Sequence, residues 1–498
     1  MITVTLLITS VLSYATYKFL QWHRKRIDLP CPPGNLILGN ALQLDLSKPH
    51  QTISKWAKTC GSIFKMRLLN QEIVIVNSLA GCTEMLVTRS EDFAGRPWIY
   101  RADFILPGPD IALQDICPRW NLMKRICMTS LKQIGDQLHE LEAMTLTVME
   151  DLVQKMLKYD GKQVNIRPEL FMAIQDISFL LIFGKRVSAD DHKEYDDLSK
   201  GALQQTGPMA KNLELEVFPF LRFPWYKKFK DLQHTTDRIN QFYQRHLEKC
   251  QKDFDGTNIK CVIDGFIQEL NSKSKDGKPS LLQKENISAA ALDLMFAGAV
   301  TTNAAMYHLI AILATHPNYQ ETAFSKITEV LHNCKPSVKD RLKIPYIDSM
   351  ILEVLRHMSH VPIGNPHKTM KDTYLQGCFI PAGTQVWPNL WHLHHDEDLW
   401  EDPWEFKADR FLDSKGMLLT ADHQLRKQFL AFGAGRRVCA GEAMAKNRMF
   451  LLTVILIQNF EFSVPKDSYI DTDPNNFELG FALTPRDYEV LVKVRKWT

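Results

Sequence analysis

The stretch from residue 287 to 316, ISAAALDLMFAGAVTTNAAMYHLIAILATH, constrains the fold more than any other part of the chain. It is long enough for about eight helical turns, and its apolar residues lie on every side of that helix. A helix that is apolar all round has to be buried, so other elements must surround it. The chain has 498 residues, 45% of them hydrophobic, which is ample for a large core.

The rest of the chain is organised around helices with a few strands. Residues 118–310 follow a mostly helical pattern, whereas SIFKMRLLNQEIVIVNS (62–78) alternates apolar and polar residues and predicts a β-hairpin. There is no internal repeat, and the breaks at 252–258 and 271–280 are expected to be surface loops between helices. Although the length suggests about three domains, we predict one mainly α-helical domain with small β-sheets over residues 36–498.

Composition and charge narrow the function classes. The formal net charge of +3 is small and there is no arginine-rich arm, which argues against a nucleic-acid partner. The ten cysteines form no CxxC pair and no regular framework, which is typical of a reducing compartment.

The N-terminus differs from the rest of the chain. Residues 1–22 are apolar enough to enter a bilayer, with Lys18 near the end, and they lack the positive start and small-residue cleavage site of a signal peptide. HRKR follows at 23–26, and the positive-inside rule then keeps the following domain cytoplasmic. We predict a membrane anchor over 1–22 and a basic, proline-rich hinge over 23–35.

A second feature is FLAFGAGRRVCAGE (429–442), in which glycines and arginines precede a single cysteine. The apolar residues after Cys439 recur at helical spacing, which predicts that Cys439 occupies the first turn of a helix. Unpaired N–H groups and the positive end of the helix dipole favour a thiolate there. Arg436 and Arg437 add positive charge.

Three interpretations of this loop are open on local grounds. Cys439 could be a buried structural cysteine. The glycines could belong to a phosphate-binding loop, although no hydrophobic β-run precedes them and Lys-Ser/Thr is missing. The third interpretation is a thiolate ligand of haem iron, with an arginine holding a haem propionate.

The loop resembles the haem-binding loop of the cytochrome P-450 family at six fixed spacings: Phe432, Gly433, Gly435, Arg437, Cys439 and Gly441. This resemblance implies that Cys439 binds the iron of haem b. The resemblance extends to FALTPRDYEVLVKV (481–494) near the C-terminus. The chain is similar to microsomal members of the family, near the steroid 17- and 21-hydroxylases and the aryl-hydrocarbon and drug-oxidising branches. The implied fold is a single large haem-thiolate monooxygenase behind an N-terminal anchor.

Within the long apolar stretch, AGAVTT carries the second part of the expected site. Ala297 and Thr301 are four residues apart and share a helical face, while Gly298 gives room for a bend or a close ligand. A buried threonine hydroxyl ordinarily bonds back to its own helix. The resemblance implies instead that Thr301 faces dioxygen, and that Val300 stands where most members carry an acid.

Glu353 and Arg356 lie three apart on one helical face, an ordinary surface ion pair in most proteins. They match the Glu-x-x-Arg of the family, which implies a structural network with Arg410 in FKADRF, where Ala408 replaces the usual proline. A carboxylate between two guanidiniums would fix the cysteine loop rather than perform chemistry.

The resemblance also implies partners for the haem propionates from four separate segments. They are Arg437, Arg96 in FAGRP, His367 in NPHKT, and Trp120 with Lys124 in WNLMKR. A lysine stands at 124 where arginine is usual, so the charge stays and the bidentate fork is lost.

The expected reaction inserts one atom of dioxygen into a lipophilic substrate, such as a steroid, a fatty acid or an aromatic xenobiotic. Electrons would come from an NADPH–flavoprotein reductase at the endoplasmic reticulum membrane, with cytochrome b5 as a second candidate partner. A haem-thiolate isomerase or peroxide-using enzyme is the alternative, because of Val300. The expected docking face for the reductase is basic and comprises Lys446, Arg448, Arg426, Lys427 and Arg125.

The substrate would contact mostly apolar segments, and the aromatic stretch 216–226 is either core or a membrane-touching lip. The expected lining segments are 100–115, 291–302, 361–365 and 477–483.

Overall fold

The structure is a computed structural model that describes residues 27–36, 38–69, 71–106, 108–136, 138–206, 215, 221–223, 225–272 and 280–496. The predicted anchor, residues 1–22, and the basic residues 23–26 lie outside the described residues. Most of the aromatic stretch 216–226 also lies outside them. Of its described members, Phe223 and Trp225 are 53% and 69% exposed, whereas Leu221 and Tyr226 are partly buried against the core.

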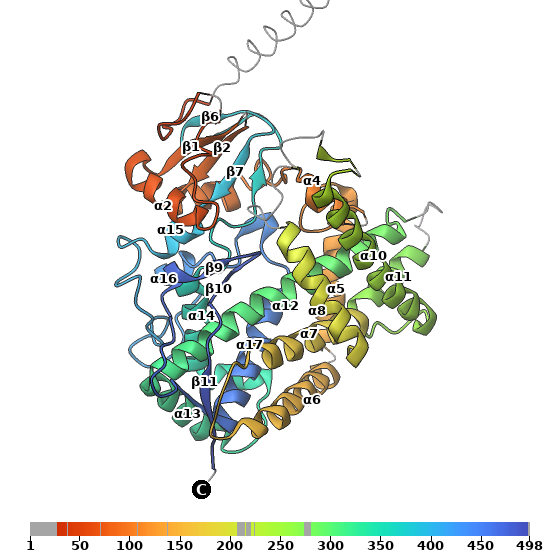
Figure 1. The fold of residues 1–498 in the computed structure, drawn as a ribbon, viewed down its shortest axis with the longest axis vertical. Coiled ribbons are helices and arrows are strands. Elements are labelled where there is room, and N and C mark those ends of the chain that lie inside the picture. The colour runs from red at the N-terminus through yellow and green to blue at the C-terminus, as the bar shows by residue number, and fades with distance from the viewer. Residues whose placement is uncertain are drawn as a thin grey trace, which may run out of the picture.

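The helix α12 (Lys284–Thr315) is the centre of the fold, close to the predicted 287–316. It crosses the middle of the helical region, with the helices α7, α10, α13, α14 and α17 packed against it (Figure 1). By length and composition it is the one described helix that could cross a membrane. However, 72% of its most apolar window is buried inside the protein, so it is a core helix.

The other helical elements surround α12 on several sides, as predicted for a helix that is apolar all round. Their bounds are α2 Pro49–Cys60, α3 Leu79–Thr83, the π-helix η1 Glu84–Thr88, α4 Tyr100–Ile105, α5 Pro118–Asp136, α6 Leu138–Met156, η2 Leu157–Tyr159, α7 Arg167–Phe183, α8 Ala189–Thr206, α10 Lys227–Asp253, α11 Val262–Asn271, α13 Pro317–Leu331, η4 Val338–Leu342, α14 Pro345–Met358, α15 Leu390–His394, α16 Gln424–Lys427, η5 Gly435–Arg437, α17 Glu442–Asn459 and η6 Pro474–Asn476.

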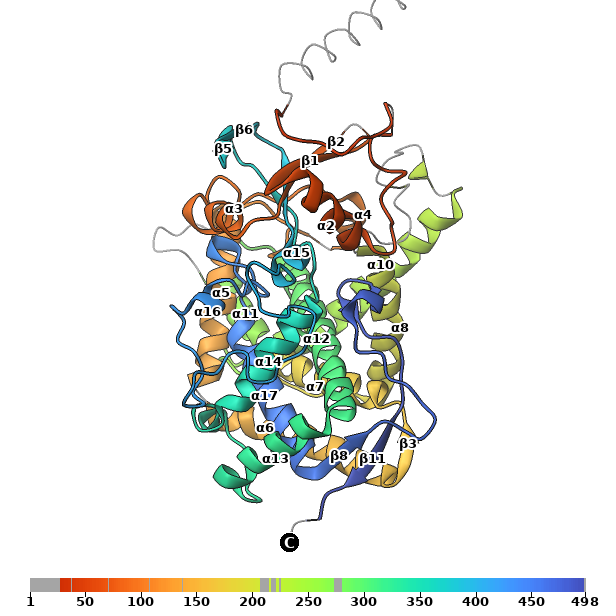
Figure 2. The same cartoon turned by 90° about the vertical axis from the view of Figure 1, so that its left-hand side faces the viewer.

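The strands form small sheets at the edges of the helical region, so the prediction of a mainly α protein with small β-sheets is confirmed (Figure 2). The largest has the order β1-β2-β7-β4, and its β1–β2 hairpin is the one predicted at 62–78. The other orders are β3-β11-β8, β9-β10 and β5-β6. The strands are β1 Ile63–Leu68, β2 Gln71–Val76, β3 Lys162–Val164, β4 His367–Lys368, β5 Thr373–Leu375, β6 Cys378–Ile380, β7 Gln385–Pro388, β8 Phe460–Ser463, β9 Glu478–Leu479, β10 Leu483–Thr484 and β11 Val490–Val494.

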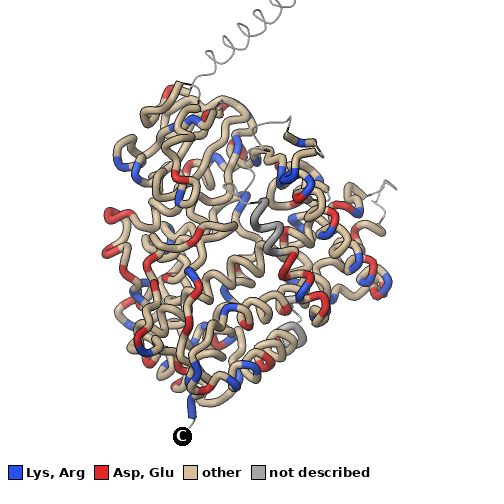
Figure 3. The backbone as a smooth tube through the Cα atoms, in the orientation of Figure 1, with Lys and Arg blue, Asp and Glu red and all other residues tan. Residues whose placement is uncertain are grey.

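The described part of the predicted hinge is packed against this largest sheet. Ile27 is 2% and Leu29 is 8% exposed, and both belong to a hydrophobic cluster with residues of β1 and β2. The carbonyl of Ile27 accepts a hydrogen bond from the Lys65 ammonium at 2.5 Å. Ile27 and Leu29 therefore belong to the folded domain. Lysine, arginine and acidic residues are interspersed over the outer elements in the view of Figure 3.

Candidate functional site

One face of α12 retains solvent access although the helix runs through the core. Ala297 is exposed, and Asp293, Leu294 and Thr301 are half-buried, whereas Met295, Ala299 and Thr302 on the other side are buried. Residues 293, 297 and 301 follow one another at four-residue spacing and so share a face. This face, which we call the α12 stripe, therefore borders a space that side chains leave open. The Thr301 hydroxyl donates to the carbonyl of Ala297 at 2.6 Å.

The cysteine loop is fixed by glycines and by its own backbone. The N–H of Cys439 donates to the carbonyl of Phe432 at 3.0 Å, which closes the loop. Gly433 and Gly435 have φ of 68° and 67°, a region that other residues rarely adopt. A Cβ at Gly435 would lie 1.7 Å from the carbonyl oxygen of Leu86 in η1, so only glycine fits against that helix.

The sequence placed Cys439 in the first turn of a helix, and this was wrong. The helix α17 begins at Glu442 with Gly441 at its N-cap, two residues after the cysteine, because the bond to Phe432 keeps Cys439 in the loop. Burial raises the pKa of the Cys439 thiol, and the N–H of Gly441 opposes this effect. Since the residue is nevertheless exposed, a metal ion could reach the sulfur and deprotonate it.

The guanidiniums of Arg437, within this loop, and of Arg96, beside it, have no carboxylate bonded to them among the described residues. Arg96 is 6% exposed, and its guanidinium donates to the carbonyls of Ala112, Asn365 and Pro366 at 2.8–3.1 Å. Arg437 donates in the same way to three carbonyls, those of residues 94, 111 and 114. Burial and, to a smaller extent, the charge of Arg437 lower the pKa of Arg96 to about 9, against the opposing charges of Asp110 and Asp115.

The remaining expected propionate partners join the same cluster. Trp120 is 4% exposed, its indole N–H donates to the carbonyl of Ile111 at 2.9 Å, and its ring lies 4.4 Å from the Arg437 guanidinium. Lys124 donates to the carbonyl of Arg436 at 2.5 Å. His367 lies 2.7 Å from the carbonyl of Phe93, and burial lowers its pKa well below the ordinary value, so it is neutral.

These features fit a haem. Arg96 is buried and Arg437 is half-buried, and among the described residues their guanidiniums donate hydrogen bonds only to carbonyls, with the charges of Asp110 and Asp115 nearby. Two such like charges favour a bound anion, and haem brings two carboxylates. The exposed Cys439 offers a soft ligand for iron on the adjoining loop. The α12 stripe supplies small side chains where a gas or a substrate needs room.

Sequence reasoning missed a pair of carboxyl groups at the N-terminal end of this stripe. The carboxylate of Asp293 accepts the N–H groups of Ile111 and Ala112 at 2.9 and 3.1 Å, and it also shares a hydrogen bond with Asp110. Burial raises the pKa of Asp110 to about 6 and that of Asp293 well above its ordinary value, so the pair holds a proton near neutral pH. The signal in the sequence was a single acid within an otherwise apolar stretch.

This pair is also tied to the cation cluster. The carbonyl of Ile111 accepts from Trp120 and Arg437, and the carbonyl of Ala112 accepts from Arg96. The segment 110–115 therefore links the α12 stripe to the guanidiniums through its own backbone.

The structure brings Glu353, Arg356 and Arg410 together. Glu353 and Arg356 are both 0% exposed, and the carboxylate accepts from Arg356 Nε at 2.8 Å and from Arg410 Nε at 2.9 Å. Arg356 also donates to the carbonyl of His394 at 2.7 Å. The His394 ring then accepts the N–H of Leu430, in the cysteine loop, at 3.3 Å.

This last bond settles the tautomer of His394. Because Nε2 accepts from Leu430, the ring proton is on Nδ1, which donates to the Ser359 hydroxyl at 2.9 Å. Burial lowers the pKa of His394 well below its ordinary value, which keeps the ring neutral. A continuous set of hydrogen bonds thus runs from Glu353 to the cysteine loop.

The expected basic docking face is in part wrong. Lys427 and Arg125 are exposed, whereas Arg448 is only 5% exposed and points into the helical core. Lys446 is half-buried and pairs with Glu442 at 2.5 Å. From the helical pattern alone, these charged residues were expected to face solvent. The pattern does not reveal that α7 and α12 pack over the part of α17 that carries Arg448.

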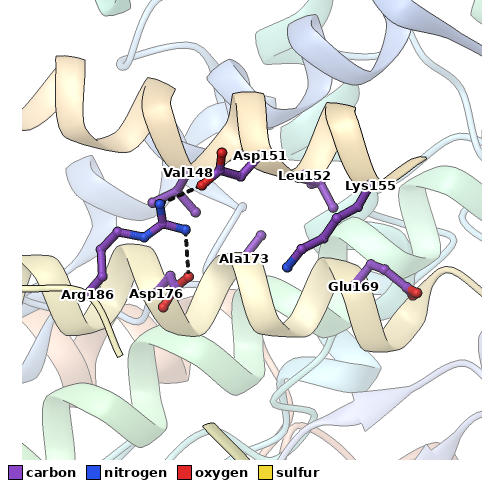
Figure 4. Close-up of a pocket in the computed structure, with 8 residues that line it drawn as sticks. All are labelled: Val148, Asp151, Leu152, Lys155, Glu169, Ala173, Asp176 and Arg186. Atoms are coloured by element: carbon purple, nitrogen blue, oxygen red, sulfur yellow. Dashed lines mark hydrogen bonds and ion pairs between the residues drawn. The ribbon is translucent and has the colours of Figure 1, made fainter. Parts of the chain in front are cut away.

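A small cavity between α6 and α7 lies apart from these residues. Its volume is about 10 Å³, enough for one water. Figure 4 shows Arg186 at one end, where it bridges Asp151 at 2.5 Å and Asp176 at 3.2 Å. This cavity is too small for an organic ligand.

Comparison with known proteins gives one consistent result. The family model described as Cytochrome P450 matches residues 29–492. Cytochrome P450 1A1 of Canis lupus familiaris is 30% identical over 461 residues, which is 89% of this chain and 86% of that protein. Cytochrome P450 1A2 of Mesocricetus auratus is 30% identical over 472 residues, 92% of this chain and 90% of that protein.

Solved structures agree in fold. A zebra fish cytochrome P450 solved with progesterone superposes with a TM-score of 0.78 at 26% identity, over 90% of this chain and 99% of that one. A zebra fish cytochrome P450 solved with abiraterone gives a TM-score of 0.76 at 24% identity, over 90% and 100%. With the match of the family model along nearly the whole chain, the conclusion is direct: this chain belongs to the cytochrome P450 family, whose members are haem-thiolate monooxygenases.

Proposed function

We propose that Cys439 is the axial ligand of the haem iron and that the chain oxidises lipophilic molecules with electrons from an NADPH–flavoprotein reductase. The observation that carries this proposal is the exposed Cys439 on the loop whose half-buried Arg437 lies near the buried guanidinium of Arg96. Bound haem supplies the iron that activates dioxygen, and a thiolate ligand favours cleavage of the O–O bond.

The residues of this chain then have separate tasks. Arg96 and Arg437 would neutralise the two haem carboxylates, and the neutral His367 would offer its second ring nitrogen, since Nδ1 is bonded to the carbonyl of Phe93. The indole N–H of Trp120 donates to the carbonyl of Ile111 and would have to leave it to reach a propionate. Lys124 adds a third cation at the margin, beside Arg436. Phe432 belongs to the wall of the cysteine loop, with the Lys446 ammonium 5.1 Å from its ring.

Proton supply is the weak point of this site. The Thr301 hydroxyl donates to the carbonyl of Ala297, so it must rotate before it can give a proton to the open side of the stripe. Val300 has no exchangeable proton. Thr302 is turned away and buried, where its hydroxyl accepts from Arg448. We therefore expect much of the reducing power to be lost as hydrogen peroxide.

A steroid-like molecule is the first substrate to test. The zebra fish relative was solved with progesterone, and the expected lining of this chain is apolar, with Phe104 and Phe481 half-buried and Ile363 buried. The Asp110–Asp293 pair adds a polar group at one end of the stripe. Fatty acids and planar aromatics are the other two classes for the same screen.

We place the protein at the endoplasmic reticulum membrane, with residues 1–22 as anchor and the catalytic domain on the cytoplasmic side. The reductase, and cytochrome b5 as a second donor, would dock near Lys427 and Arg125. A mainly apolar cavity of about 310 Å³ lies beside Lys427, between α3 and the segment 424–434. It is lined in part by Leu79, Val87 and Lys427.

The test uses the full-length protein with reductase in phospholipid vesicles. A lipophilic substrate should shift the haem absorption, and NADPH should be consumed with formation of an oxygenated product. Product formation from peroxide alone, without a contribution from NADPH, would overturn the proposal in favour of a peroxide-using enzyme. An unoxygenated, rearranged product would do so in favour of an isomerase.

A further inference from the structure

Arg448 joins the helices on both sides of the site. It lies on α17, which follows Cys439, and its Nη2 donates to the carbonyl of Gly298 and to the hydroxyl of Thr302, both at 2.7 Å. Its Nη1 donates to the hydroxyl of Ser178 on α7 at 2.8 Å. One guanidinium therefore connects α7, α12 and α17 at the turn that carries the α12 stripe.

Every partner of this guanidinium is a neutral oxygen. Within the described residues no carboxylate forms an ion pair with Arg448, and its Nε has no hydrogen-bond partner. Burial lowers its pKa to about 10, which still leaves the side chain charged at neutral pH. The fold thus holds an uncompensated positive charge between the helix after Cys439 and the oxygen-facing helix, at a considerable cost in desolvation.

Gly298 lies directly at this contact. A Cβ built at this position would lie 3.4 Å from the Ser178 hydroxyl and 3.8 Å from Arg448 Nη2, which are ordinary contact distances. The polar groups of α7 and α17 therefore pack closely against the α12 backbone at this residue. On the neighbouring carbonyl, that of Ala297, the extra donor is Thr301. The carbonyls of Ala297 and Gly298 thus each accept a hydrogen bond from a side chain, Thr301 and Arg448 respectively.

We propose that Arg448 is a positioning residue for the haem site: it fixes the Ala297–Thr302 turn, and its unpaired charge makes the haem iron easier to reduce. Reduction adds one electron to ferric iron and breaks no bond, so a nearby fixed cation stabilises the ferrous product. This inference rests on the proposed function in one respect, the assignment of the iron to Cys439.

The expected size follows from the position of Arg448 on the chain. Arg448 lies six residues after the start of α17 at Glu442, about 9 Å along the helix at 1.5 Å per residue. The three loop residues back to Cys439 bring the separation to on the order of 13 Å. With an effective dielectric constant of about 20, a unit charge at that distance changes the ferric–ferrous equilibrium constant about tenfold.

The experiment is a spectroelectrochemical titration of the purified full-length holoprotein. It needs neither a reductase nor a substrate. Arg448→Gln should lower the equilibrium constant for reduction of the iron about tenfold relative to the natural chain. Arg448→Lys keeps the charge and should therefore have an equilibrium constant close to that of the natural chain. Thr453→Val is the control: Thr453 is a buried α17 residue whose hydroxyl contacts Met306 of α12 at 3.8 Å, and it is expected to leave the potential unchanged.

A second pair keeps Arg448 in place. Ser178→Asp puts a carboxylate against Nη1 and should lower the potential in the same direction, whereas Ser178→Asn, of equal size, should not. If Arg448→Gln and Ser178→Asp both retain the potential of the natural chain, the inference is overturned. If Arg448→Gln does not fold, the two Ser178 variants decide. A natural chain without a thiolate-type carbon monoxide spectrum would overturn the proposed function and this inference together, whereas a normal spectrum with unchanged potentials overturns the role of Arg448 alone.

Discussion

Replacing Glu353 with glutamine tests whether the buried ionic network holds the cysteine loop. The carboxylate accepts from Arg356 Nε and Nη2, both at 2.8 Å, from Arg410 Nε at 2.9 Å and from the N–H of Lys407 at 3.1 Å. Glutamine keeps one oxygen but turns an NH₂ group toward a guanidinium. It also removes the single negative charge that the two arginines share.

The loss is large because the side chains of Glu353 and Arg356 are 0% exposed and that of Arg410 is only 5% exposed. Breaking a fully buried ion pair by changing one partner costs about 3–5 kcal/mol. With an unfolding entropy of about 2.1 cal/mol/K per residue, a chain of this length loses ~1 °C of melting temperature for each kcal/mol. We therefore expect Glu353→Gln to melt about 3–5 °C below the natural protein.

The assay is thermal unfolding followed by far-UV circular dichroism, together with the carbon monoxide spectrum of the reduced protein. Because Arg356 reaches Leu430 through His394, the thiolate-type share of that spectrum should fall as well. Glu405→Gln is the matched control. The chemical change is identical, and the Glu405 side chain is exposed on the loop that also carries Lys407 and Arg410. Equal melting temperatures and equal spectra for both variants would refute the link between the network and the loop.

Three further changes test other parts of the account. Removal of residues 1–26 should weaken membrane binding and leave thermal stability unchanged, whereas removal of 1–29 also deletes the buried Ile27 and Leu29 and should cost at least about 2 kcal/mol; equal melting of the two truncations would contradict this. Burial raises the pKa of Asp110 to about 6, so the folded state binds more protons than the unfolded state between roughly pH 4 and 6. The stability that this group contributes is present below that window and lost as pH rises through it. The melting temperature of Asp110→Asn should therefore change less between about pH 4 and 6 than that of the natural chain. Equal pH dependence of the two melting temperatures would disprove the effect. Val300→Glu should raise the product formed per NADPH and lower the peroxide released, when product, peroxide and NADPH are measured together; tight coupling of the natural chain would refute this.

Local periodicity was sufficient to predict the main elements of the fold. The buried helix expected at 287–316 is Lys284–Thr315, and the hairpin expected at 62–78 is β1–β2, because both are encoded by neighbouring residues. The start of α17 was predicted too early, since a bond between Cys439 and Phe432 sets it and such loop closure leaves no periodic signal.

Contacts between distant segments account for what sequence reasoning missed. Asp110 and Asp293 are far apart in the chain and meet only because the 110–115 segment folds onto α12. Arg448 was expected to be solvated, and it is buried because α7 and α12 cover it. His394 had no expected role, although its ring connects the Glu353 network to the cysteine loop.

The central claim is that Cys439 is the iron ligand, and the carbon monoxide difference spectrum of the reduced protein tests it most directly. The natural full-length chain should show the band characteristic of thiolate-ligated haem, and Cys439→Ala should lose that band while Cys334→Ala, a change of another exposed cysteine, retains it. Persistence of the thiolate-type band in Cys439→Ala would contradict the account, because another cysteine would then have to hold the iron.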